Sequence, residues 1–282
     1  MLMETPQALS ARCYVLGSRY FPLFWLGTEP PTLVEGGVSA VVPRVLKQMR
    51  GLSLNPPQQV ILLHEHPDHV LGLPLLKARW PHIEAVATPE ASRLLSQEKT
   101  IQSHKETDRF FTKVLIEQGE GEKAGWSDFL PPAPIKPENL PPGIHIIPAQ
   151  GHSPGSCALF WEKEGILFAS DALGYYSSKG KHFPLFFQSL ALYLDSIRRM
   201  EDIKPAILVL GHLHYFKKEQ VPQVFRRSRE EALMLAENIK TQKENAETMT
   251  FKAICQDELT TLYPEEITRR LARLLVKKSL EN

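Results

Sequence analysis

Short apolar runs separated by turn residues recur along the chain, a pattern typical of β-strands. The strands predicted from it are Cys13–Leu16, Phe21–Leu26, Thr32–Val34, Gln59–Leu63, Glu84–Ala87, His145–Pro148, Cys157–Trp161, Ile166–Ala169 and Ile207–Leu210. Apolar residues at helical spacing predict helices over Val42–Met49, Leu71–Trp80, Pro89 to about Gln118, Val221–Glu244 and Pro264–Leu280. Ser39 and Thr88 are expected to cap two of these helices. The alternation predicts an α/β fold with parallel strands covered by helices.

Two segments depart from this alternation. Residues 119–143 are rich in proline, which fixes φ and removes hydrogen-bond donors, so an irregular connection is expected there. From Val221 the chain is charged and helical, which suggests a main domain over residues 1–220 and a helical extension over residues 221–282. The extension has two apolar faces, formed by Leu233, Leu235 and Ile239, and by Ile267, Leu271, Leu274 and Leu275. We expect these helices to cover the mouth of the functional site or to form a homodimer contact.

Composition excludes several classes of protein. Lys and Arg number 33 against 32 Asp and Glu, a net charge of +1, so a strongly basic nucleic-acid-binding protein is not expected. No apolar run approaches the roughly 20 residues of a membrane span, and no basic and apolar leader opens the chain. Cys13, Cys157 and Cys255 are odd in number and far apart, which predicts buried thiols in a reducing, cytoplasmic setting.

Metal-type side chains follow the ends of four predicted strands. The run His-Glu-His-Pro-Asp-His comes directly after the strand Gln59–Leu63, and three single residues follow later strands. The seven candidate metal ligands are His64, His66, Asp68, His69, His152, Asp171 and His212. Functional groups of open α/β sheets gather beyond the carboxyl ends of the strands, so these side chains are predicted to meet at one rim.

The ligand types fit a pair of divalent ions. Imidazole and carboxylate suit zinc, iron and manganese alike, so the identity of the metal is left open. Two ions about 3.5–4 Å apart need roughly six or seven ligands, one of which can be a shared carboxylate. His64 and His66 are two residues apart and point the same way, whereas Asp68 and His69 can serve a second ion.

The run His64–His69 matches the HxHxDH signature of the metallo-β-lactamase fold superfamily, which this sequence resembles. The segment Gly151–Ser156 resembles the second motif of that family, and the motifs come in family order over about residues 11–216. The resemblance implies a four-layer αβ/βα sandwich. It also implies that one metal is held by His64, His66 and His152, the other by Asp68, His69 and His212, with Asp171 as the bridging ligand.

A narrower resemblance concerns the bacterial quinolone-signal-response thioesterase. It rests on Leu33–Ser39, Ser170–Gly174 and the helix Leu190–Met200. The relative has a glutamate where this chain has Tyr175. The resemblance therefore implies hydrolysis of an acyl thioester, with a different acyl group. Aromatic residues after the bridging aspartate, together with His214, are the candidate substrate-binding residues: Tyr175, Tyr176, Phe183, Phe186, Phe187 and His214.

The expected activity is a binuclear metal-dependent hydrolase of a small carboxyl ester, most simply a thioester, with a metal-bridging hydroxide as the nucleophile and Asp68 as the catalytic proton acceptor. Two alternatives stay open. One is an oxidoreductase, a persulfide dioxygenase with a single iron held by His64, His66 and His152. The other is a regulatory binding protein whose hydrolytic site is incidental.

Overall fold

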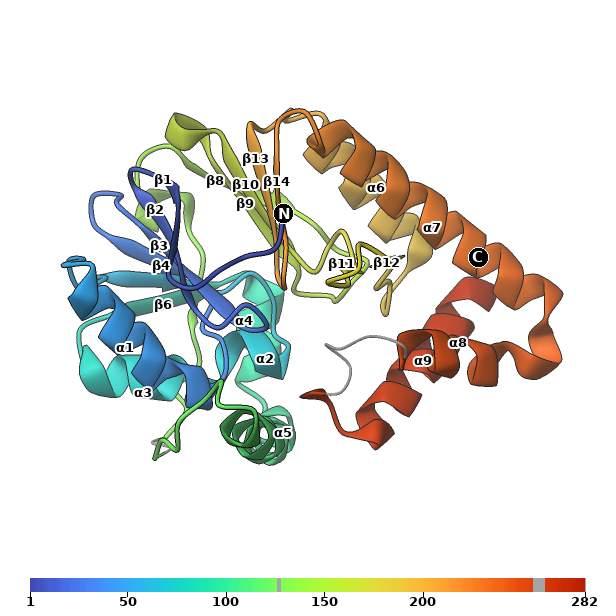
Figure 1. The fold of residues 1–282 in the computed structure, drawn as a ribbon, viewed down its shortest axis with the longest axis horizontal. Coiled ribbons are helices and arrows are strands. Elements are labelled where there is room, and N and C mark those ends of the chain that lie inside the picture. The colour runs from blue at the N-terminus through green and yellow to red at the C-terminus, as the bar shows by residue number, and fades with distance from the viewer. Residues whose placement is uncertain (126–127, 256–261, 282) are drawn as a thin grey trace. The chain divides into compact units, whose positions relative to one another are not determined.

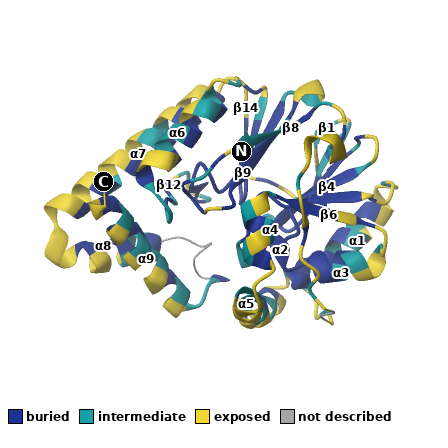
Figure 2. Cartoon of the chain, turned by 180° about the vertical axis from the view of Figure 1, so that it is seen from behind, coloured by how far each residue is buried: buried dark blue, intermediate teal, exposed yellow. Residues whose placement is uncertain are grey.

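The computed structural model describes residues 1–125, 128–255 and 262–281. The chain forms two compact units. The first comprises residues 3–144, and the second comprises residues 145–282 together with Met1–Leu2. Each unit contains a β-sheet whose central strands are buried, while the helices expose one side (Figure 2).

The sheet of the first unit has seven strands that pair in chain order: β1 (Gln7–Ser10), β2 (Cys13–Gly17), β3 (Pro22–Leu26), β4 (Thr32–Val34), β5 (Gln59–Ile61), β6 (Glu84–Ala87) and β7 (Ala133–Pro134). Strands β1 to β4 are antiparallel, whereas β4 to β7 are parallel. Because β4 and β5 are parallel neighbours, the residues that follow them emerge at the same edge of the sheet.

The helices of the first unit are α1 (Val42–Gly51), α2 (Pro67–Val70), α3 (Leu73–Arg79), α4 (Pro89–Leu95) and α5 (Glu98–Glu117). Proline occupies one of the first two positions of each of the first four, where its missing N–H is not needed. Thr88 caps α4 as predicted, because its hydroxyl oxygen accepts a hydrogen bond from the backbone nitrogen of Ala91 at 3.1 Å. Helix α1 packs against β2 and is buried through Val45 and Met49.

The sheet of the second unit has five strands in the order β14 (Tyr215–Lys217), β13 (Ile207–Leu210), β10 (Ile166–Ser170), β9 (Cys157–Trp161) and β8 (Ile144–Pro148). A separate two-stranded sheet pairs β11 (Tyr175–Tyr176) with β12 (His182–Phe183). The helices are α6 (Leu190–Glu201), α7 (Val221–Thr241), α8 (Ala246–Ile254) and α9 (Glu265–Leu280). Helices α6 and α7 lie side by side, and α9 packs against α7 and α8 (Figure 1).

The strands predicted from the apolar runs are all present, and the α/β class is confirmed. The prediction for Ser39 is wrong. It begins the 3₁₀ turn η1 (Ser39–Val41), and its hydroxyl donates to the Asp108 carboxylate at 2.5 Å instead of capping a helix. The helix predicted from Pro89 to about Gln118 is interrupted at Ser96–Gln97 and forms α4 and α5. The elements that the sequence patterns did not predict are β1, β7, β11, β12, β14, α2 and α8.

The C-terminal helices are present. The predicted apolar face of α9 is confirmed, because Leu275 is buried and Ile267, Leu271 and Leu274 are half-buried. The buried face of α7 includes Ile239 as predicted but otherwise differs from the predicted one. Helix α7 buries Val221, Val224, Phe225, Ser228, Ala232, Ala236 and Ile239. Leu233, predicted to lie on the apolar face, is 48% exposed, and Leu235 is only partly buried. Cys13 and Cys157 are buried as expected, but Cys255 is exposed. Among the described helices, none has the length and apolar character that crossing a membrane requires.

Candidate functional site

The histidine run of the first unit leads from strand β5 into helix α2. His64 follows the strand, His66 is the N-terminal cap residue of α2, and Asp68 and His69 lie within the helix. The ring centroid of His64 is 4.8 Å from that of His66 and 4.1 Å from that of His69. Asp68 Oδ2 lies 3.2 Å from His69 Nε2. The structure thus brings these four predicted ligands together, all of them buried except the half-buried His66.

Glu35 belongs to the same cluster and was not predicted. It follows strand β4, has a left-handed φ of 67°, and its side chain is buried. Glu35 Oε1 lies 3.1 Å from His69 Nδ1, and its other carboxylate oxygen accepts a hydrogen bond from the Leu63 backbone nitrogen at 3.4 Å. A carboxylate that holds one ring nitrogen fixes the tautomer and orientation of a metal-binding histidine. The sequence feature that could have identified Glu35 is its position, directly after a predicted strand and before Gly36-Gly37.

Close backbone packing holds this glutamate against the histidine run. The Gly36 nitrogen donates to the His69 carbonyl oxygen at 2.7 Å, and the Gly72 nitrogen donates to the Gly37 carbonyl oxygen at 3.0 Å. A Cβ atom added at Gly72 would lie 2.2 Å from the Gly36 carbonyl oxygen. The approach of the two segments therefore requires glycine at position 72.

The three predicted ligands of the second unit also lie together. His152, Asp171 and His212 follow strands β8, β10 and β13, and all three are buried. Asp171 Oδ2 is 3.5 Å from His152 Nε2, and Asp171 Oδ1 is 3.4 Å from His212 Nε2. Each oxygen of this carboxylate thus faces a different imidazole. That arrangement suits a carboxylate shared by two ions.

The tautomer of His152 is fixed by its surroundings. Its Nδ1 lies 2.8 Å from the carbonyl oxygen of Leu185, and because a carbonyl can only accept, Nδ1 carries the proton. His152 Nε2, the nitrogen that faces Asp171, is then the unprotonated atom that a metal requires. With the Glu35–His69 pair, two of the predicted histidine ligands have the supporting hydrogen bond typical of metal sites, so the residues of both units fit divalent ions.

The predicted substrate-binding residues lie in the second unit and are mostly packed against one another. Phe186 is fully buried against the ring of Tyr193, with ring centroids 5.9 Å apart. Phe187 is half-buried, and its ring centroid lies 5.3 Å from that of His152. Tyr175 pairs with Phe183 across the β11–β12 hairpin, with ring centroids 6.2 Å apart. Phe187 thus places an aromatic ring beside a predicted ligand.

Tyr176 and His214 belong to a buried aromatic cluster. The Tyr176 ring centroid is 4.8 Å from that of His182, 6.0 Å from that of His214 and 5.1 Å from that of Phe216. Burial raises the pKa of Tyr176 to about 12, although the nearby Arg227 opposes the shift. Burial likewise lowers the pKa of His182 to about 4. Tyr176 and His182 are therefore both neutral at pH 7.

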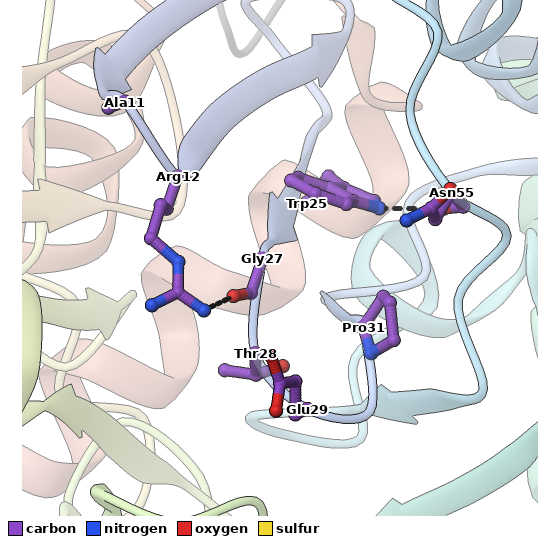
Figure 3. Close-up of a pocket in the computed structure, with 8 residues that line it drawn as sticks. All are labelled: Ala11, Arg12, Trp25, Gly27, Thr28, Glu29, Pro31 and Asn55. Atoms are coloured by element: carbon purple, nitrogen blue, oxygen red, sulfur yellow. Dashed lines mark hydrogen bonds between the residues drawn. The ribbon is translucent and has the colours of Figure 1, made fainter.

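A cavity of about 350 Å³ lies at the opposite edge of the first sheet, before the start of β4 and β5 (Figure 3). Arg12 donates to the Gly27 carbonyl oxygen, and Trp25 Nε1 donates to the Asn55 carbonyl oxygen at 3.0 Å. These polar groups stabilise the turns around the cavity. The cavity is thus separated from Glu35 and His64 by the length of the strands.

Comparisons with known proteins identify the family of this chain. The sequence profile of the metallo-beta-lactamase superfamily matches residues 23–212. The uncharacterized protein YobT of Bacillus subtilis (strain 168) is 24% identical over 217 residues, which cover 70% of this chain and 85% of that protein.

Two solved structures share the fold. The metallo-beta-lactamase family protein TTHA1429 from Thermus thermophilus has a TM-score of 0.64 at 18% identity, covering 97% of this chain and 93% of that one. TTHA1623 in a di-iron-bound form has a TM-score of 0.52 at 19% identity, covering 78% of this chain and 98% of that one. The matched profile includes all seven predicted ligands, and the chain belongs to the metallo-β-lactamase superfamily.

Proposed function

We propose that this protein is a binuclear metal-dependent hydrolase of small carboxyl esters, and that thioesters are its preferred substrates. Family membership supports a metal-dependent hydrolase in general. The observation that carries the binuclear proposal is the carboxylate of Asp171, whose two oxygens face His152 Nε2 and His212 Nε2 at 3.5 and 3.4 Å. A carboxylate that served one ion would not need an imidazole beside each oxygen.

The proposed ligands follow from the family motifs. By these motifs His64, His66 and His152 would hold one ion, Asp68, His69 and His212 would hold the other, and Asp171 would be shared. The distance of 3.2 Å between Asp68 and His69 supports their assignment to one ion. Zinc, iron and manganese all accept this donor set. The di-iron form of the related structure TTHA1623 makes iron a candidate worth measuring first.

Divalent ions in such a site supply a Lewis acid and a water molecule whose pKa is lowered to about 7. The residues of the chain perform the remaining tasks. Glu35 and the Leu185 carbonyl orient the rings of His69 and His152. Asp68 is the proposed proton acceptor, because its carboxylate is buried and lies 3.2 Å from His69 within the same cluster.

The preference for thioesters follows from the leaving group. A thiol has a pKa near 8.5 and departs as a thiolate, whereas an amine must be protonated as it departs. Among the described residues assigned to the site, none serves as a strong acid for that step. Phe187 beside His152 supports an apolar acyl group, and Tyr175 in place of the relative's glutamate suits a neutral one. Penicillins and other amides are therefore expected to be poor substrates.

The test is a panel of substrates measured with metal analysis of the same preparation. We expect two metal ions per chain and faster turnover of aryl- or acyl-CoA thioesters than of penicillins or phosphodiesters. His66→Ala should lose most of the metal and the activity, while His82→Ala, an exposed histidine of the same unit, should lose neither. Oxygen consumption with a persulfide and one iron per chain would instead identify a dioxygenase. Metal-free protein that still captured a specific partner would favour a regulatory role.

A further inference from the structure

A second cavity of the first unit, about 660 Å³ in volume, lies between the turn η1, helix α5 and the segment that follows α5. Its volume is typical of sites for small ligands, which range over about 300–1,000 Å³. The residues that give it its chemistry are Ser39, Lys105, Asp108, Arg109, Thr112 and Lys123. None of them is among the proposed metal ligands, so the cavity is a feature in its own right.

The floor of this cavity is formed by the buried residues Ser39 and Asp108 and the half-buried Thr112. The backbone nitrogen and the hydroxyl of Ser39 donate to the two carboxylate oxygens of Asp108, at 3.0 and 2.5 Å. The hydroxyls of Ser39 and Thr112 are 3.3 Å apart. Each carboxylate oxygen has two acceptor positions, so the Asp108 carboxylate can accept further hydrogen bonds. The floor therefore suits a ligand group that donates hydrogen bonds.

The rim of the cavity has the opposite character. Lys105 and Arg109 are one helical turn apart on α5, and Lys123 joins them from the following segment. Two carboxylates, those of Asp108 and Asp128, also line the cavity, and the three cations outnumber them. The rim therefore attracts anions, and the arginine offers the planar pair of donors that matches a phosphate group.

Helix α5 connects the cavity with the histidine run of the same unit. His104 Nε2 donates to the Glu65 carbonyl oxygen at 2.8 Å, within the sequence His64-Glu65-His66. Asp108 is one turn further along the helix, a distance of about 6 Å along its axis. The cavity therefore begins about one helical turn along α5 from the residue that contacts the histidine run.

We propose that this cavity binds the phosphorylated adenosine end of a coenzyme A thioester, with the adenine amino group at the Asp108 floor and the phosphates at the cationic rim. The inference rests on the proposed thioester hydrolysis, because coenzyme A is then the leaving group. Adenosine phosphates combine a hydrogen-bond donor at one end with several negative charges at the other, as the floor and rim require.

The binding test uses adenosine 3′,5′-bisphosphate and isothermal titration calorimetry on the full-length protein. We expect the triple variant Lys105→Ala/Arg109→Ala/Lys123→Ala to bind at least tenfold more weakly than the parent chain. Lys113→Ala removes an exposed lysine of the same helix that does not line the cavity, and should bind like the parent. Asp108→Asn should weaken adenosine bisphosphate binding and leave pyrophosphate binding unchanged. Equal affinities in the parent and triple variant would overturn the proposal.

The kinetic test compares one acyl group on two thiols. With the acyl-CoA, the triple variant should show a KM at least tenfold higher and a kcat within about twofold of the parent. With the N-acetylcysteamine thioester, which lacks the nucleotide, both constants should be unchanged. If the parent and the triple variant hydrolyse the acyl-CoA with the same KM and kcat, the cavity does not bind coenzyme A, although the proposed thioester hydrolysis is supported. If the parent chain binds adenosine 3′,5′-bisphosphate more tightly than the triple variant but hydrolyses no thioester, the proposed reaction is wrong and the cavity is still a nucleotide-binding site.

Discussion

At the scale of single residues, the carboxylate of Glu35 fixes the orientation of the His69 ring. One oxygen lies 3.1 Å from His69 Nδ1, and the other accepts from the Leu63 backbone nitrogen. Nε2 of the same ring is thereby turned toward Asp68. A buried acid in this position acts on the metal through the histidine, so its effect should appear in metal affinity.

We therefore predict that Glu35→Gln lowers metal affinity about 10- to 100-fold. The amide has no charge to stabilise the ligand, and the NH₂ group of glutamine would face either the Leu63 N–H or the His69 Nδ1–H, donor against donor. Chelator competition followed by elemental analysis measures the loss. Glu84→Gln, an exposed acid at the start of β6, is the matched control. Unchanged affinity in Glu35→Gln would show that His69 is oriented by other groups.

The sequence was sufficient to predict which candidate ligands lie together within each unit, because they follow strand ends and the run His64–His69 is dense in metal-type residues. It was insufficient for Glu35, whose role depends on a left-handed backbone and on packing against His69. Ser39 shows the same limit. Its residue type and position fit a helix cap, but the tertiary contact with Asp108, 69 residues away, determines what its hydroxyl does.

At the scale of elements, His182 joins the β11–β12 hairpin to helix α7. Its Nε2 lies 2.7 Å from the Leu173 carbonyl oxygen and 3.3 Å from the Ser228 hydroxyl. Burial, the largest cause, lowers the pKa of His182 to about 4, and the positive charge of Arg227 acts in the same direction. The neutral ring is therefore the form that this junction accommodates.

This depressed pKa predicts a loss of stability in acid. The unfolded chain takes up the proton near pH 6.5 and the folded chain only near pH 4, so stability is full above about pH 6.5 and falls as the pH drops toward 4. Between pH 7.5 and pH 5 the parent should lose about 2 kcal/mol more than His182→Gln. Urea unfolding at both pH values measures the difference, with His82→Gln as an exposed-histidine control. If the parent and His182→Gln lose the same free energy of unfolding between the two pH values, protonation of His182 does not cause the loss.

The elements that the patterns missed are short or locally ambiguous. Strands β7, β11 and β12 have two residues each, too few for any alternation to be visible. The hairpin β11–β12 exists because its aromatic side chains pack against α7 and β14, which a local pattern does not contain. The long apolar runs, by contrast, were sufficient to predict the strands that form both sheets.

At the scale of the whole molecule, helices α7, α8 and α9 supply part of the core of the second unit. Helix α7 packs against β12 through a buried face that includes Val224 and Phe225. We predict that deleting residues 221–282 leaves a poorly soluble protein with altered substrate preference, because that face of the unit becomes exposed. The milder change Phe225→Ala should cost about 3–5 kcal/mol of stability. A truncated chain that stays soluble, monomeric and kinetically unchanged would contradict this prediction.

The outer face of α7 has exposed apolar side chains that could form a homodimer contact. Leu233 and Met234 are 48% and 53% exposed and adjacent on the helix. If this face forms a homodimer, Leu233→Glu/Met234→Glu should convert a dimer into a monomer in light-scattering chromatography. Leu52→Glu, at an exposed leucine of the other unit, should leave the mass unchanged. A parent chain that is monomeric at about 100 μM would exclude the homodimer.

The missing side chain at Gly72 has a consequence for how the gene can vary. Because a methyl group there would meet the Gly36 carbonyl oxygen at 2.2 Å, every non-glycine codon at position 72 should be purged by selection. In a saturation library grown under selection for metal-dependent activity, position 72 should be as intolerant as the histidine codons themselves. Position 51, where an added Cβ meets nothing within 4 Å, should accept most residues. Glycine at position 72 should then be retained among functional variants as strictly as the metal-binding histidines, because the contact between the two backbone segments depends on it.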